Sequence, residues 1–142
     1  ELGYNYRMTD MQAALAKSQL KRANENLEKR HRIAKKYDLA FKDTPLKTPF
    51  VDSNSYHGYH LYVIGLKNRD DMYYHLRQNN IFPQIHYIPV HLQPYYRNLG
   101  WRKGDMPCAE NYYQQCLSLP MYPSLTEEEQ DYVIEKVMEL LS

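Results

Sequence analysis

The feature that most constrains the fold is a long stretch of helical periodicity near the N-terminus. Between about Asp10 and Phe41, apolar residues recur at spacings of three, four and seven, as in an amphipathic helix. Thr9 with Gln12 has the pattern of a capping box and predicts the helix start. A helix of this length would extend about 45 Å. Because a small domain cannot bury such a rod alone, we expect it to pack on another domain or subunit as well.

Three short strands are expected after this helix. β-branched and aromatic residues favour strands at 59–64 and 81–87, and a third at 117–120 ends at a proline. Pro83 restricts the second strand to an edge, an early position or a bulge.

Helices are expected between and after these strands. They are predicted at about 68–78, from Pro107, and after the capping box formed by Thr126 and Glu129. The buried face of the helix from Pro107 is expected to consist of Ala109, Tyr112, Tyr113 and Cys116. The order predicts an α/β fold of the α+β kind, with a small mixed sheet of about three strands flanked by helices. We divide the chain into an N-terminal segment with its long helix, 1–42, and a small domain, 43–142.

The composition excludes several classes of protein. A formal net charge of +1 argues against an electrostatic nucleic-acid binder. No apolar run approaches the roughly 20 residues of a membrane span, and the first residues lack the regions of a signal peptide. Cys108 and Cys116, on one helix, would lie about 12 Å apart, beyond disulfide reach. Free cysteines fit a reducing cytoplasm. Since the chain begins without methionine, we expect a fragment or a processed protein.

The segment before the first helix has the groups of an anion site. Asn5 and Arg7 stand two residues apart, just before the predicted helix start. Free N–H groups at a helix N-terminus, a guanidinium fork and an amide NH₂ suit a phosphate. The alternative is a capped helix preceded by ordinary polar residues.

A second candidate site lies where the 81–87 strand ends. His86 and Tyr87 occupy a position where ligands gather in α/β folds, and His86 could bind a phosphate or a sugar hydroxyl. The alternative is a set of structural histidines. Two pairs were tested as metal ligands, His86 with His91 and His57 with His60. Neither has a Cys, Asp or Glu close in sequence, so no metal is expected.

Four segments resemble the DegT/StrS class of nucleotide-sugar aminotransferases. They are 3–15 (GYNYRMTDMQAAL), 86–95 (HYIPVHLQPY), 109–123, which contains LSLPMYP, and 126–130 (TEEEQ). The sequences of these segments most resemble the branch of the class that aminates a 4-keto sugar on UDP. One departure is the Asn80–Pro83 turn, where a glycine is expected.

The resemblance implies the C-terminal domain of a fold type I aminotransferase, a homodimer with active sites at the subunit interface. Such an enzyme uses pyridoxal 5'-phosphate to pass an amino group, for instance from glutamate, to a keto nucleotide-sugar, here a UDP-4-keto-6-deoxy sugar for surface polysaccharide. The lysine that binds the cofactor lies in the upstream domain, so this chain holds no catalytic residue and is expected to be inactive alone. No lysine here sits in the apolar setting that a nucleophilic amine requires.

The resemblance also implies roles for single residues. Asn5 corresponds to an asparagine that reaches the cofactor phosphate of the partner subunit. Arg7 corresponds to a residue near the substrate diphosphate, and His86, Tyr87 and His91 to the part that contacts the nucleotide-sugar. Two alternatives stay open: a pyridoxamine-phosphate-dependent deoxysugar dehydratase of the same class, or a non-catalytic dimerisation or ligand-binding module.

Overall fold

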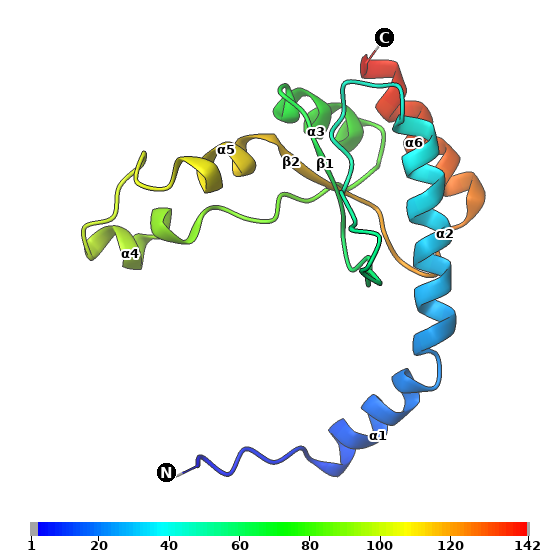
Figure 1. Cartoon of the computed structure of the whole chain (residues 1–142), viewed down its shortest axis with the longest axis vertical. Helices are drawn as coiled ribbons and strands as arrows, with labels where there is room; N and C mark the ends of the chain where they lie inside the picture. Colours follow the sequence, from blue (N-terminus) through cyan, green and yellow to red (C-terminus); the bar gives the residue numbers. More distant parts are fainter. Residues whose placement is uncertain (1–2, 142) are drawn as a thin grey trace.

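The computed structural model describes residues 3–141. Six α-helices, one 3₁₀ helix and two strands are formed within them. In chain order they are α1 (Asp10–Leu20), α2 (Ala23–Phe41), β1 (Tyr62–Gly65), α3 (Arg69–Gln78), η1 (Val90–Leu92), α4 (Pro94–Asn98), α5 (Pro107–Gln115), β2 (Cys116–Leu119) and α6 (Glu127–Leu141). Figure 1 shows a body built from α2, α3, α6 and the two strands, with two extensions that leave it toward the same side.

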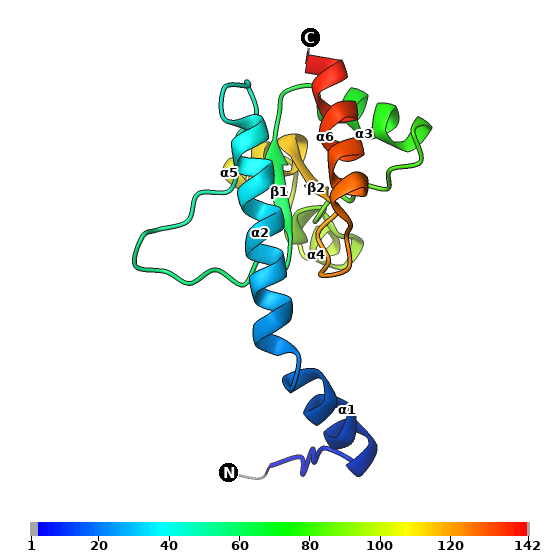
Figure 2. The ribbon, with the colours of Figure 1, turned by 90° about the vertical axis from the view of Figure 1, so that its right-hand side faces the viewer.

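The core lies between a small antiparallel sheet and three helices. β1 pairs with β2 so that Tyr62 faces Leu119 and Gly65 faces Cys116. Helix α6 lies beside both α2 and α3 (Figure 2). The largest fully buried side chains come from all of these elements and include Tyr37, Phe41, Tyr62, Ile64, Met72, Leu76, Leu117 and Val137. The expected combination of a small sheet with flanking helices is therefore confirmed.

The strand expected at 81–87 is reduced to a single bridge. Gln84 pairs with Ser118 through two backbone hydrogen bonds, of 3.1 and 2.8 Å, in antiparallel geometry. Pro83 has no N–H, so the ladder cannot extend in its direction. The described sheet thus has two strands and is antiparallel, whereas three strands in a mixed sheet were expected.

The single helix predicted from about 10 to 41 is wrong, because two helices replace it. Arg22 leaves helical geometry at φ −106° and ψ 0°, between α1 and α2. Residues 20–25, all within the described chain, are exposed. Most helical stability in proteins comes from tertiary packing, and that packing is missing at this point. Helix α1, none of whose described residues is buried, projects away from the body (Figures 1 and 2).

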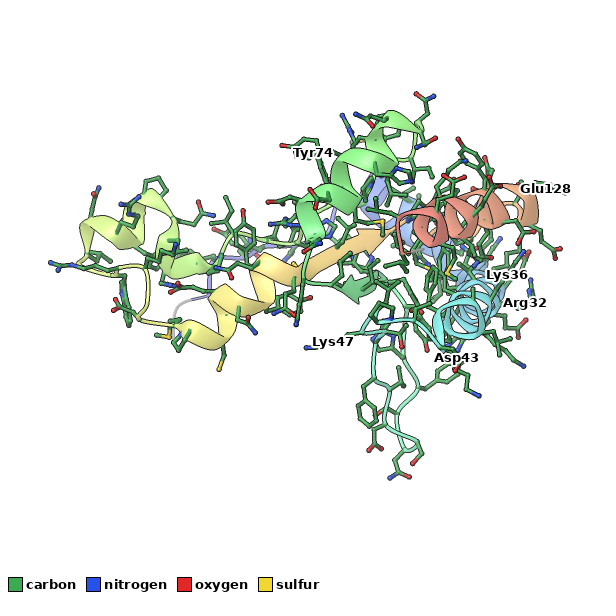
Figure 3. All side chains as sticks on the ribbon, turned by 90° about the horizontal axis from the view of Figure 1, so that it is seen from above. Arg32, Lys36, Asp43, Lys47, Tyr74 and Glu128 are labelled. Carbon is green, nitrogen blue, oxygen red and sulfur yellow. The ribbon has the colours of Figure 1, made fainter. Side chains whose placement is uncertain are left out.

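The helix expected from Pro107 forms, but its buried face differs from the prediction. Ala109 and Tyr112 are exposed, and the buried residue on α5 is Glu110. Residues 88–115, which we call the arm, contain η1, α4 and α5. Figures 1 and 3 show the arm reaching out from the sheet, so that it has no apolar layer to cover. A polar residue therefore occupies the inside of the arm.

Candidate functional site

Asn5 and Arg7 lie in an extended segment directly before α1. Asn5 adopts a positive φ of 57°, and both side chains are exposed. Within the described residues neither side chain has a hydrogen bond or an ion pair. The capping box behind them is confirmed, since the Thr9 and Gln12 backbone N–H groups donate to the partner's side-chain oxygen. An amide and a guanidinium are thus free for a ligand at the head of this helix, as an anion site requires.

His86 is held from one side of its ring. Its Nδ1 lies 2.8 Å from the Oγ of Ser118, a residue buried on β2. Tyr87 is largely exposed, and its ring meets that of His86 edge-on at 4.6 Å between centroids. Since Nδ1 is engaged, the second ring nitrogen, Nε2, is the one left for a ligand.

His86 and Ser118 also line a cavity of about 530 Å³. Its walls are mainly apolar, with Ile81 and Leu119 among them, and Tyr132 belongs to its lining. A volume of this size is in the range of small-molecule sites. His86 therefore stands at the edge of a hollow rather than on a flat surface.

His91 is placed differently from the other predicted site residues. It is buried, and its Nε2 lies 2.8 Å from Oε1 of Glu110. The backbone N–H of Gly104 donates to the same oxygen at 2.7 Å. The hydrogen bond from His91, followed by the one from Gly104, lowers the pKa of the Glu110 carboxyl. The imidazole of His91 is thus already engaged inside the arm.

The structure brings together one part of the predicted site. His86, Tyr87 and Ser118 form one group. Asn5 and Arg7 belong instead to the segment that precedes α1, and α1 projects away from the body (Figure 1). No contact joins the two groups among the described residues. One chain therefore presents the candidate site residues in two separate groups, which we call half-sites.

The lysines are the candidate nucleophilic amines of the described residues. Every lysine is exposed or half-buried. The hydrogen bonds that Lys136 donates to Glu139 and Glu135 raise its pKa, which is opposite to the change that a nucleophilic amine requires. No group of three or more metal-binding side chains occurs between residues 3 and 141. Over the same residues no helix is long and apolar enough to cross a membrane.

A known protein family matches almost the whole chain. The profile of the DegT/DnrJ/EryC1/StrS aminotransferase family matches residues 1–138. The chain belongs to this family.

Relatives in the DegT/DnrJ/EryC1/StrS family are much longer than this chain. The spore coat polysaccharide biosynthesis protein SpsC of Bacillus subtilis is 41% identical over 98% of the chain and 38% of SpsC. A UDP-4-amino-4,6-dideoxy-N-acetyl-beta-L-altrosamine transaminase of Campylobacter jejuni is 32% identical over 99% of the chain and 39% of its own length. The crystal structure of S. venezuelae DesV, in complex with a ketimine intermediate, matches 100% of the chain and 39% of DesV, with a TM-score of 0.94 and 30% identity.

The chain thus spans about two fifths of the length of the relatives it matches. Its fold is that of the C-terminal part of a fold type I aminotransferase, as the sequence predicted.

The sequence analysis did not identify two residues that bind the candidate site histidines, Ser118 and Glu110. Ser118 stands between Leu117 and Leu119 in a strand, and a polar side chain in such a buried run must find a hydrogen-bond partner. Glu110 lies within the 109–123 segment that resembles the aminotransferase class, but no role was predicted for it. Its burial and its two donors could not be read from its neighbours in sequence.

Proposed function

We propose that this chain is the C-terminal part of a pyridoxal-phosphate-dependent enzyme that transfers an amino group, from glutamate, to a keto nucleotide-sugar. The observation that carries the proposal is the pair of free side chains, Asn5 and Arg7, at the head of α1 in a chain matched by this family. Both side chains offer donors suited to phosphate oxygens, which the cofactor and a nucleotide diphosphate share.

The residues present fit one part of a cofactor site. Asn5 would donate its amide to the cofactor phosphate, and Arg7 would bind the substrate diphosphate with its guanidinium fork. When bound, pyridoxal phosphate supplies the electron sink for transamination. The lysine that anchors it would come from the preceding part of the complete enzyme.

The half-sites favour an active site shared between subunits. His86 and Tyr87 would contact the sugar in one subunit, while Asn5 and Arg7 of a second copy would close the site over the phosphates. Helix α1 supports this assignment because Met11, Leu15 and Leu20 are exposed on it. In this arrangement residues 1–42 connect the cofactor domain to the small domain, 43–142, of a cytoplasmic homodimer.

Two relatives support the choice of substrate. Similarity to SpsC favours a role in surface-polysaccharide synthesis, and similarity to the Campylobacter enzyme favours a UDP-linked sugar. We therefore propose a UDP-4-keto-6-deoxy sugar as the amino acceptor. In binding it, the chain would supply orientation, which can lower a barrier by several kcal/mol.

The test is an assay of the complete enzyme with glutamate and a UDP-4-keto-6-deoxy sugar, following 2-oxoglutarate and the amino sugar. Arg7→Ala should weaken nucleotide-sugar binding, by about tenfold or more for a lost charged hydrogen bond, with little change in melting temperature. Loss of a sugar hydroxyl without consumption of glutamate would instead identify the dehydratase. Absence of any turnover, with ligand binding retained, would identify a non-catalytic module.

The 142-residue chain provides a second test. Incubated with equimolar pyridoxal phosphate and then borohydride, it should carry no stable label on any lysine, because none is activated. Labelling at one specific lysine would show that the cofactor is anchored here and would overturn the assignment.

A further inference from the structure

The arm, residues 88–115, holds its shape without an apolar core. Its only buried residues, all within the described chain, are Pro89, His91 and Glu110. Large apolar side chains along it are exposed, among them Tyr95, Leu99 and Trp101. Within the described chain, the contacts that join the parts of the arm to one another are therefore mainly polar.

Those contacts converge on one carboxylate oxygen. Oε1 of Glu110 on α5 accepts from Gly104 N–H at 2.7 Å and lies 2.8 Å from His91 Nε2 on η1. Gly104 has a φ of 99°, a conformation that glycine adopts without steric cost. A single side chain thus ties together the 3₁₀ helix, the turn before α5 and α5 itself. Hydrogen bonds to a charged group are roughly twice as strong as neutral ones.

The arm continues directly from the candidate ligand groups. His86 and Tyr87 immediately precede it, and Tyr87 is 73% exposed at its base. Any movement of η1 relative to α5 would be transmitted along the few residues between Tyr87 and His91. The contact between Glu110 and His91 is therefore in a position to influence the orientation of the Tyr87 side chain.

We propose that Glu110, acting through His91, is a positioning residue for nucleotide-sugar binding. The inference rests on the proposed function and adds to it that His91 serves the site from inside the arm rather than by touching the sugar. A pre-ordered arm would hold Tyr87 in place before substrate arrives, so loosening the arm adds an entropic cost to binding and weakens it. The groups that carry out the chemistry lie elsewhere, so turnover of bound substrate is unaffected.

The experiment compares variants of the complete enzyme. Glu110→Ala should raise KM for the nucleotide-sugar about tenfold and leave kcat within about twofold. Glu110→Gln keeps an oxygen that can accept from Gly104 and His91 but loses the charge, so its KM should lie between those of Glu110→Ala and the unmodified enzyme. Gln114→Ala, on an exposed position of the same helix, is the matched control and should change neither constant.

Hydrogen exchange of the Gly104 amide supplies an independent readout. Protection should be lost in Glu110→Ala and kept in Glu110→Gln, with the exchange of β1 and β2 unchanged in both. An unchanged KM in Glu110→Ala, a fall in kcat alone, or a KM of Glu110→Gln as high as that of Glu110→Ala would overturn the inference. If the unmodified enzyme shows no transamination, the proposed function fails by itself. Unchanged Gly104 protection in Glu110→Ala would then overturn the role of Glu110 in ordering the arm.

Discussion

Ser118 Oγ lies 2.8 Å from His86 Nδ1 and so connects a buried strand to a ring that stands at the edge of a cavity. Both backbone groups of Ser118 are bonded to Gln84, which leaves its side chain little freedom. The hydroxyl therefore sets the orientation of the imidazole and selects which nitrogen is free.

Removal of this hydroxyl should weaken ligand binding more than it weakens the fold. In Ser118→Ala the ring loses one hydrogen bond, with a net contribution of about 0.5–1.5 kcal/mol, so we expect nucleotide-sugar affinity of the complete enzyme to fall roughly twofold to tenfold. Calorimetric titration measures this change, and thermal unfolding measures the fold. Ser118→Thr retains the hydroxyl and is the control. Equal affinity in Ser118→Ala would show that the contact is incidental.

Features predicted correctly from the sequence depend on neighbouring residues. The capping boxes at Thr9 and Thr126 both form. Each of these needs only a few adjacent positions to be recognised. The position of Asn5 and Arg7 before a helix start is also a local property, whereas their role in an anion site stays a prediction.

Features that were missed depend on residues far apart in the chain. The strand at 81–87 was over-predicted because its pairing depends on a partner far away in sequence. Among the described residues of this segment, Gln84 alone forms a bridge, with Ser118. The break at Arg22 is not marked by a glycine or a proline in the neighbouring sequence. Glu110 and His91 are hydrogen-bonded although they lie 19 positions apart, and no local sequence pattern predicts this contact. Sequence reasoning placed both in motifs but could not see that they bind each other.

Buried tyrosines should make the fold sensitive to alkali. Burial raises the pKa of Tyr62 above its ordinary value of 10.0, and its 2.6 Å hydrogen bond to Asp38 adds to the shift. Burial also raises the pKa of Tyr37. Because these pKa values are higher in the folded state, the stability they contribute is complete below pH of about 10 and is lost as the pH rises further. Denaturant unfolding, compared at neutral pH and at about pH 11, measures the loss.

Tyr62→Phe separates ionisation from packing. It removes the donor to Asp38, so it should cost about 1–3 kcal/mol at neutral pH. Above pH of about 10, however, its free energy of unfolding should fall less steeply, since one buried phenol no longer titrates. Tyr95→Phe, at a position 70% exposed, is the control and should follow the unmodified chain. Parallel curves for Tyr62→Phe and the unmodified chain would contradict this account.

Arg30 should contribute more to the stability of the fold than the exposed Arg32 on the same helix. Its Nη1 donates to the carbonyls of Tyr59 and Met121 at 2.9 Å each, and so ties α2 to the segments before β1 and after β2. Arg30→Ala leaves both carbonyls without this donor, and we expect a loss of about 1–3 kcal/mol in free energy of unfolding. Arg32→Ala, exposed on the same helix, should change it by less than about 0.5 kcal/mol. Equal effects of the two variants in urea unfolding would rule out the role of Arg30.

The positive φ of Asn5 allows its side chain to be tested without disturbing the backbone. Glycine adopts a φ of 57° readily, so Asn5→Gly deletes the amide and keeps the conformation of the segment. If the amide donates to the cofactor phosphate, the complete enzyme should bind pyridoxal phosphate about tenfold or more weakly, the size expected for one hydrogen bond to a charged group. Asn5→Asp should weaken it further because a carboxylate would face the phosphate. Dialysis against cofactor-free buffer, followed by absorbance, measures retention. Full retention in Asn5→Gly would show that this segment does not reach the cofactor.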